Sequence, residues 1–247
     1  MRRRFFVERF TGGKATLEGE AAHHLGRVLR AEPGQLYELS DGREVNLARV
    51  ERAGKDSIEF TVVENVLIRP RSLEVTLLIA VVKFDRFEWA LEKATELGAA
   101  EIVPLATARG EKALLAAAPK RAARWRKILF ESAQQARCLR PPALLPLSSS
   151  AEGFRTAREA AVRILFSERP DATPLRIVFQ SNVATAKPTP ASPTRFALAI
   201  GPEGGWTDAE FASAEAAGFR EAALGENILR TETAVVAALA AAQLFWS

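Results

Sequence analysis

Hydrophobic and polar positions divide the chain into two parts with different periods. Up to about residue 70, the apolar runs are short and are separated by turn signals; the candidate strands are 15–17, 35–39 and 58–63. The Asp41-Gly42 pair after the second run is typical of a β-hairpin. Only Glu20–Leu29 has a helical pattern. These patterns predict a small β-barrel over residues 1–70, with a linker up to Ser72.

From Leu73 onward the apolar runs alternate with helical patterns. Five runs resemble buried strands: Val75–Val81, Glu101–Leu105, Arg163–Ser167, Phe196–Ile200 and Glu221–Leu224. Helical spacing predicts helices over 84–97, 120–136, 207–218 and 232–246, and the third opens with Thr207-Asp208-Ala209-Glu210, the pattern of a capping box. Strands that alternate with helices predict a parallel α/β domain over 73–247. Gln180–Thr194, rich in Pro, Ser and Thr, is predicted to be a surface loop.

Composition excludes several classes of protein. No window reaches the roughly 18 apolar residues that cross a bilayer, and the opening Met1–Val7 runs into Glu8 without the apolar region of a signal peptide. A single cysteine, Cys138, excludes an internal disulfide and a cysteine zinc cluster. The histidines are His23 and His24, so no metal site is expected. We expect a soluble cytoplasmic protein without a membrane partner.

Positive charge is concentrated in one predicted helix. The net charge is +4, and residues 119–140 hold seven basic residues against one acid. At helical spacing, Lys120, Arg124, Lys127, Glu131 and Gln134 share one face, beside an apolar face that contains Trp125 and Ile128. The basic face fits RNA phosphates, although a solvated charged face has the same pattern.

Two segments follow predicted strands and offer candidate chemistry. The strand Phe196–Ile200 runs into Gly201–Gly205, where glycines allow a ligand to approach the backbone closely. The strand Glu221–Leu224 leads to Arg230, just before Thr231, the expected cap of the last helix. Carboxyl ends of parallel strands meet at one edge of a sheet, so both segments can face one site. A plain strand-to-helix turn and a solvated loop arginine remain alternatives.

These segments resemble a known family. IGPEGGWTDAE (200–210) and LGENILRTETAVVAALA (224–240) are similar to the cofactor motifs of the SPOUT superfamily, and within it to the RsmE family. The resemblance extends over nearly the whole chain, through positions that include Arg86, Glu88 and 96–98 in the second part and 28–30 in the first. The chain departs from the family at Ala133, where a glutamate is frequent, and in a longer loop before Phe196.

The resemblance implies a fold, a reaction and a set of residues. The fold would be a knotted parallel-sheet methyltransferase domain preceded by a PUA-like barrel, and the reaction would be S-adenosylmethionine-dependent methylation of uridine N3 in 16S ribosomal RNA, at the uridine conventionally numbered 1498. The implied cofactor-binding residues are Ile200, Gly201, Pro202, Glu203, Gly204, Gly205, Leu224, Gly225, Ile228, Leu229, Arg230, Thr231 and Thr233. Together with the basic helix, the implied RNA contacts are Arg4, His24, Arg30, Lys83, Arg86, Arg109, Arg124, Lys127, Gln134 and Arg137.

Methyl transfer to uridine requires loss of the N3 proton, so a cation that stabilises the resulting anion assists the reaction. Arg230 is the candidate for this role. Glu232 is a less suitable general base, because a helix N-terminus stabilises a carboxylate in its charged form. The family implies a homodimer, and the apolar helix at 234–246 fits either a subunit interface or burial within one subunit. Alternatives are a related enzyme for transfer RNA or a ribose hydroxyl, and a non-catalytic RNA-binding assembly factor.

Overall fold

The computed structural model describes residues 4–183 and 193–246 and contains two compact units. The first unit comprises residues 1–69 together with 131–141, and the second comprises 70–130 and 142–247. Within the described residues, none of the helices is both long and apolar enough to cross a membrane. Within the same residues, His, Cys, Asp and Glu side chains form no group that could hold a metal ion.

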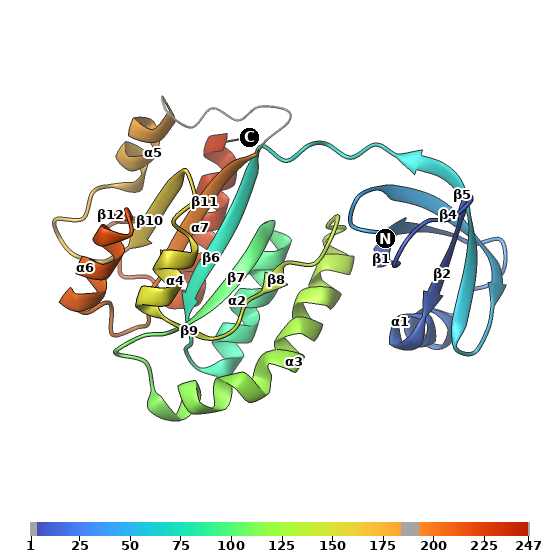
Figure 1. Cartoon of the computed structure of the whole chain (residues 1–247), viewed down its shortest axis with the longest axis horizontal. Helices are drawn as coiled ribbons and strands as arrows, with labels where there is room; N and C mark the ends of the chain where they lie inside the picture. Colours follow the sequence, from blue (N-terminus) through green and yellow to red (C-terminus); the bar gives the residue numbers. More distant parts are fainter. Residues whose placement is uncertain (1–3, 184–192, 247) are drawn as a thin grey trace. The chain divides into compact units, whose positions relative to one another are not determined.

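A curled five-stranded sheet forms the first unit (Figure 1). Its strands are β1 (Arg4–Phe6), β2 (Lys14–Glu18), β3 (Leu36–Ser40), β4 (Val45–Ala53) and β5 (Ser57–Val66), in the order β1-β3-β4-β5-β2. β1 pairs parallel with β3, and the other pairs are antiparallel. Alternating residues such as Phe5, Leu39 and Phe60 point into a core that is closed to solvent. The expected β-rich first domain is therefore present.

The predicted helix at 20–29 is shorter and less regular than expected. The α-helix α1 (Gly19–His23) passes into a wider π-helical turn, η1 (His24–Val28). In this turn the amide of Leu29 donates to the carbonyl oxygen of His24 over 3.2 Å. The wider turn allows both Leu25 and Ala31 to be buried in the core of the unit. The prediction of a single regular helix did not include this change of geometry.

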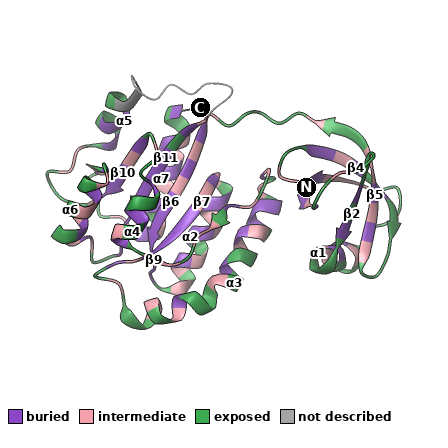
Figure 2. Ribbon diagram, in the orientation of Figure 1, coloured by how far each residue is buried: buried purple, intermediate pink, exposed green. Residues whose placement is uncertain are grey.

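A parallel sheet forms the second unit. Its strands are β6 (Leu73–Ala80), β7 (Ala99–Ala106), β8 (Ala143–Leu144), β10 (Val162–Phe166), β11 (Thr194–Ile200) and β12 (Arg220–Ala222), in the order β12-β10-β11-β6-β7-β8, with β9 (Ser148–Ser149) also paired to β7. All these pairs are parallel. Each of the five predicted strands is present, with small shifts at its ends. Figure 2 shows the central strands mostly buried, as expected for a sheet covered on both faces.

Helices cover both faces of this sheet. One core contains side chains from α2 (Phe84–Glu96), α3 (Lys112–Gln135), α5 (Leu175–Val183) and α7 (Thr231–Trp246). The core on the opposite face contains Phe154 of α4 (Ser150–Thr156), Ala214 of α6 (Asp208–Ala216) and the indole of Trp206. The sequence-based α/β class is confirmed, and the trefoil knot stays a prediction.

Two further predictions, a helix and a loop of the second unit, differ from the structure. α3 begins at Lys112 instead of Lys120 and continues through Pro119, because Ala118 is fully buried and Leu114 and Leu115 pack on the core. The predicted loop Gln180–Thr194 begins inside α5, where Val178 and Phe179 are buried and hold the helix against the sheet. Residues 184–192 of that loop lie outside the described part of the chain.

Candidate functional site

A cavity of 740 Å³ lies where β10, β11 and β12 end. Its walls come from the loops that follow these strands, 167–174, 201–207 and 223–230, and from the first residues of α5 and α7. This is the edge at which parallel α/β sheets bind ligands. The volume is within the range of about 300–1,000 Å³ that is common for small-molecule sites.

The loop after β11 is held in one conformation by hydrogen bonds and by close packing. The indole Nε1 of Trp206 donates to the carbonyl oxygen of Phe166 over 2.9 Å, and Arg109 donates to the carbonyl oxygen of Gly204 over 2.6 Å. Gly205 has φ +70°, a conformation that favours glycine. A Cβ on Gly201 would stand 2.9 Å from the Trp206 ring, so the backbone fits there only without a side chain.

The capping box predicted at Thr207 is confirmed and extends into a larger network. Glu210 accepts hydrogen bonds from the Thr207 amide and hydroxyl, and also from the Ala108 amide and the Ser150 hydroxyl. Burial by itself would raise the pKa of this carboxyl, but these hydrogen bonds outweigh burial and lower the pKa below its ordinary value of 4.5. A charged carboxylate therefore fixes the end of the loop after β11 to the segments after β7 and β9.

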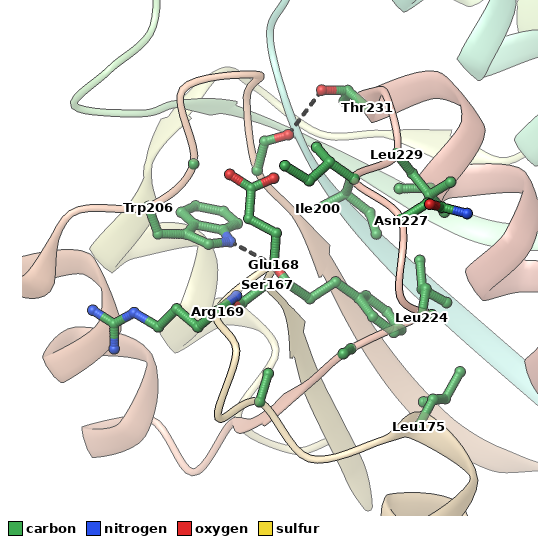
Figure 3. A pocket seen from close by; sticks show the side chains of 18 of the residues that line it. Ser167, Glu168, Arg169, Leu175, Ile200, Trp206, Leu224, Asn227, Leu229 and Thr231 are labelled. Atoms are coloured by element: carbon green, nitrogen blue, oxygen red, sulfur yellow. Dashed lines mark hydrogen bonds between the residues drawn. The ribbon is translucent and has the colours of Figure 1, made fainter.

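The loop after β12 is attached mainly at its two ends. The amide of Ala223 donates to the carbonyl oxygen of Thr173, and the Thr231 hydroxyl donates to the carbonyl oxygen of Gly201 over 2.9 Å. Between these points, residues 225–228 are exposed, including 75% of Ile228. Figure 3 shows the Thr231 bond above the cavity, where it joins the two loops that the sequence placed at one site.

Thr231 does not cap α7 as expected. α7 begins at Thr231 itself, and Arg230 precedes it with its carbonyl oxygen accepting the amide of Ala234 over 2.8 Å. Arg230 thus occupies the cap position, while the Thr231 hydroxyl is used for the bond to Gly201. The local sequence could not show this preference, because the competing acceptor lies on another loop.

The structure brings most of the predicted cofactor residues together. Those that line the cavity are Ile200, Gly201, Pro202, Glu203, Gly205, Leu224, Gly225, Ile228, Leu229 and Thr231. The predicted residues that do not line it are Gly204, Arg230 and Thr233. Arg230 and Thr233 are exposed, and Arg230 stands between Leu229 and Thr231, so it is at the margin of the cavity and not in its wall.

Glu203 and Glu232, the two acidic residues among the predicted site residues, both lie close to the guanidinium of Arg86. Arg86 of α2 donates to Glu203 over 3.0 Å, and its Nε lies 3.9 Å from Glu232 at the start of α7. Glu232 is largely buried, with 14% of its side chain exposed, and its second carboxylate oxygen has no hydrogen-bond partner. Arg86, expected to contact RNA, is therefore engaged with the loop after β11 and the start of α7.

The loop after β10 was missed by the sequence analysis. Ser167, Glu168, Arg169 and Pro170 line the cavity, as do Leu175 and Arg176 of α5. A signal existed, because Arg163–Ser167 was predicted as a strand of the same parallel sheet, and the residues after its end belong at the same edge. The loop has no glycine motif, and motif reading alone therefore passed over it.

The predicted RNA contacts differ in exposure. Arg30, Lys83, Arg109, Arg124, Lys127 and Arg137 are exposed, and His24 and Arg86 are half-buried. Arg4 and Gln134 are buried instead, with 9% and 6% of their surfaces exposed. Arg4 binds Glu38 and the carbonyl oxygen of Arg137 within the first unit. Gln134 was expected on the outer face of α3, and its burial corrects that placement.

The basic face of α3 is partly neutralised by an acidic residue of α2. Both carboxylate oxygens of Glu88 lie within 2.9 Å of the Arg124 guanidinium, and Arg121 lies 3.7 Å from Glu88. The apolar side of the helix packs as predicted, with Trp125 against Phe87 at 4.6 Å between ring centroids. The helix therefore presents less free positive charge than its sequence suggested.

Comparisons with known proteins agree with this architecture. Residues 69–243 match an RNA methyltransferase domain, and residues 17–63 match an RNA methyltransferase PUA domain. The chain is 34% identical over 239 residues to the ribosomal RNA small subunit methyltransferase E of Synechocystis sp., which covers 94% of this chain and 74% of the relative. It is 33% identical to the protein of the same name from Mycobacterium bovis, with 96% and 89% covered.

A solved structure is similar over the full length. The ribosomal RNA small subunit methyltransferase E of Neisseria gonorrhoeae, bound to S-adenosyl methionine, aligns with a TM-score of 0.82 and 28% identity, covering 100% of this chain and 98% of the other. The family match, the length of the sequence matches and the shared fold lead to one conclusion. The chain belongs to the RNA methyltransferase family, in the group of ribosomal RNA small subunit methyltransferases E.

Proposed function

We propose that this protein transfers the methyl group of S-adenosylmethionine to N3 of a uridine in 16S ribosomal RNA. The observation that carries the proposal is the cavity at the ends of β10, β11 and β12, in a chain of this methyltransferase group. Because its proposed substrate is the small ribosomal subunit or its RNA, the reaction would take place in the cytoplasm. The relatives are named for small-subunit ribosomal RNA, which supports this substrate class.

The cavity fits a nucleoside methyl donor. Its wall combines apolar side chains such as Ile200 and Leu229 with backbone of the glycine loop, and its volume of 740 Å³ accommodates a ligand of that size. When bound, the donor supplies an electrophilic methyl group on a positively charged sulfur. The rigid loop after β11 would position it, and such positioning contributes up to roughly 7–11 kcal/mol to a reaction between two bound groups.

Arg230 is our candidate for the residue that acts on the acceptor base. Its backbone lies between two cavity-lining residues, while its side chain is exposed and so accessible to RNA. A guanidinium near the uridine would stabilise the N3 anion that attacks the methyl group. Glu232 is a weaker candidate base, because one of its carboxylate oxygens lies 3.9 Å from Nε of Arg86 and only 14% of its side chain is exposed.

The proposal is tested with purified protein, 16S RNA and labelled methyl donor. We expect Arg230→Ala to retain donor affinity in calorimetry while single-turnover methyl transfer falls about 100-fold or more, the loss typical of removing one group that stabilises transition-state charge. Arg158→Ala, an exposed arginine outside the cavity wall, is the matched control and should behave as wild type. Near-normal transfer by Arg230→Ala would reject the role of this residue.

Mass mapping of the product decides the substrate. Digestion of the reacted RNA should yield N3-methyluridine at one position, with naked RNA and assembled subunits compared as substrates. A methylated ribose, or methylation of transfer RNA instead, would assign the protein to a different reaction of the same fold. Donor binding without transfer to any of these RNAs would favour an assembly factor.

We further propose a homodimer. The end of α7 exposes apolar surface that water does not favour, with 84% of Leu244 and 39% of Phe245 exposed. A second copy of the chain would cover this surface. Light scattering should give twice the chain mass of 26.9 kDa, and a monomeric mass at working concentration would contradict the proposal.

A further inference from the structure

Glu168 places a carboxylate without a partner in the cavity. The residue is the second after the end of β10 and lines the cavity wall. Its Oε1 lies 3.6 Å from the position that a Cβ on Gly205 would occupy, and Figure 3 shows its side chain between Trp206 and Ile200. Among the residues that the structure describes, none forms an ion pair or side-chain hydrogen bond with this carboxylate. A charge in this position is therefore available to a ligand.

Several other charged residues of the cavity wall are engaged, whereas Arg176 and Glu226 line it, as Glu168 does, without an ion pair or side-chain hydrogen bond among the described residues. Glu203 is paired with Arg86, and Arg109 donates to the carbonyl oxygen of Gly204. The guanidinium of Arg169 is paired with Asp208 and lies over the ring of Phe211 at 3.6 Å. These pairs connect parts of the wall to each other. Glu168 differs from these paired residues, because its carboxylate forms no ion pair or side-chain hydrogen bond among the residues that the structure describes, and its Oε1 lies beside the glycine loop.

A carboxylate in this position distinguishes the donor from the product by charge. S-adenosylmethionine carries a positive sulfonium in addition to its amino acid zwitterion, so its net charge is +1. S-adenosylhomocysteine, which remains after transfer, is a neutral thioether with the same zwitterion, adenine and ribose. Glu168 is exposed in the cavity, and attraction between its charge and the sulfonium acts on the first ligand and is absent for the second.

We propose that Glu168 is a specificity-determining residue that favours the charged methyl donor over the neutral product. This inference rests on the proposed function only in the identity of the ligand. After transfer, the charge that Glu168 attracts has disappeared from the ligand, and the carboxylate is left uncompensated. Release of the product is thereby favoured, and the cavity becomes available to a new donor molecule.

The measured quantity is the ratio of the two dissociation constants. Calorimetry gives Kd for S-adenosylmethionine and for S-adenosylhomocysteine with wild type, Glu168→Gln and Asp171→Asn. Glu168→Gln keeps the size of the side chain and removes its charge. Asp171→Asn is the matched control, because it removes a charge from the same loop outside the cavity wall.

We expect Glu168→Gln to weaken the binding of S-adenosylmethionine about fivefold, the upper end of the range for an exposed charge pair, and to change the binding of S-adenosylhomocysteine by less than about twofold. Sinefungin carries a protonated amine in place of the methyl sulfonium, so its binding should be weakened by Glu168→Gln as much as that of the donor. The preference of the wild type should also shrink as salt is raised, and the control should keep the wild-type ratio.

Equal weakening of both ligands by Glu168→Gln would overturn the inference, because it would indicate contact with the ribose or the amino group that both share. Unchanged affinities would overturn it as well. If the wild type bound neither ligand, the proposed function itself would fail. If the wild type bound both ligands and Glu168→Gln kept the wild-type ratio of dissociation constants, only this inference would fail, and the proposed function would stand.

Discussion

The loops after β11 and β12 meet at one cavity, but they are held in different ways. Residues 201–207 are fixed along their length by the Trp206 indole, by Arg109 and by the network of Glu210. Residues 223–230 are fixed at their ends, by Ala223 and by Thr231, with exposed side chains between. A rigid wall and a more adaptable wall thus face the same ligand. Rigid walls define where a ligand binds, whereas adaptable ones can close around it.

The largest effect is expected from a side chain on the rigid loop. Gly201→Val places a Cβ 2.9 Å from the Trp206 ring, so either the indole or the loop must move. We expect donor affinity to fall by about 100-fold or more, since misplaced positioning groups cost that much in other sites. Gly225→Ala tests the other loop, because a Cβ there meets nothing within 4 Å. Calorimetry on both variants compares their affinities for the donor. Similar losses of affinity in the two variants would contradict the difference between the two loops.

The next effect is expected from the anchor of the rigid loop. Glu210→Gln replaces a buried acceptor by a group whose amide faces the donors of Thr207, Ala108 and Ser150. We expect a loss of about 2–3 kcal/mol in the free energy of unfolding, which corresponds to a fall in Tm of about 5–10 °C for a chain of this size. Denaturant unfolding and calorimetry measure both quantities.

The same variant should change how stability depends on pH. The folded-state pKa of Glu210 lies below its ordinary value of 4.5, so its stabilisation is complete above that pH and is lost as the pH falls through the folded pKa. Wild type should therefore lose more stability than Glu210→Gln on acidification below pH 4.5. Parallel losses in the two proteins would show that Glu210 does not contribute in this way.

The smallest effect is expected at the bond between the loops. Thr231→Val removes the hydroxyl that donates to Gly201 and preserves the shape of the side chain. We expect a loss of about 1 kcal/mol in stability, with Tm lower by about 2–4 °C, and a modest weakening of donor binding. Thr233→Val, at an exposed position of the same helix, is the control. If the control lost as much, the bond to Gly201 would not be the cause.

Local patterns in the sequence were sufficient for much of the fold. Strands β6, β7, β10 and β11 and helices α2, α6 and α7 follow from runs of apolar residues, from helical spacing and from the capping box at Thr207. The two strand-end segments that line the cavity also follow, since parallel strands end at one edge. These features depend on residues that are neighbours in the chain, and a single sequence therefore contains the information.

Only the tertiary structure decided which side chains find partners. The sequence does not indicate that the Thr231 hydroxyl donates to the carbonyl oxygen of Gly201, or that Arg86 pairs with Glu203. Nor does it indicate that Glu168 lines the same cavity with its carboxylate unpaired. Burial of Arg4 and Gln134 likewise depends on segments far away in the chain. Hydrophobic periodicity specifies which face of an element is buried, but the neighbour that a polar group meets is set by how the elements pack. For this protein the sequence determined where the site lies, and packing determined which of its charged groups are paired within the protein.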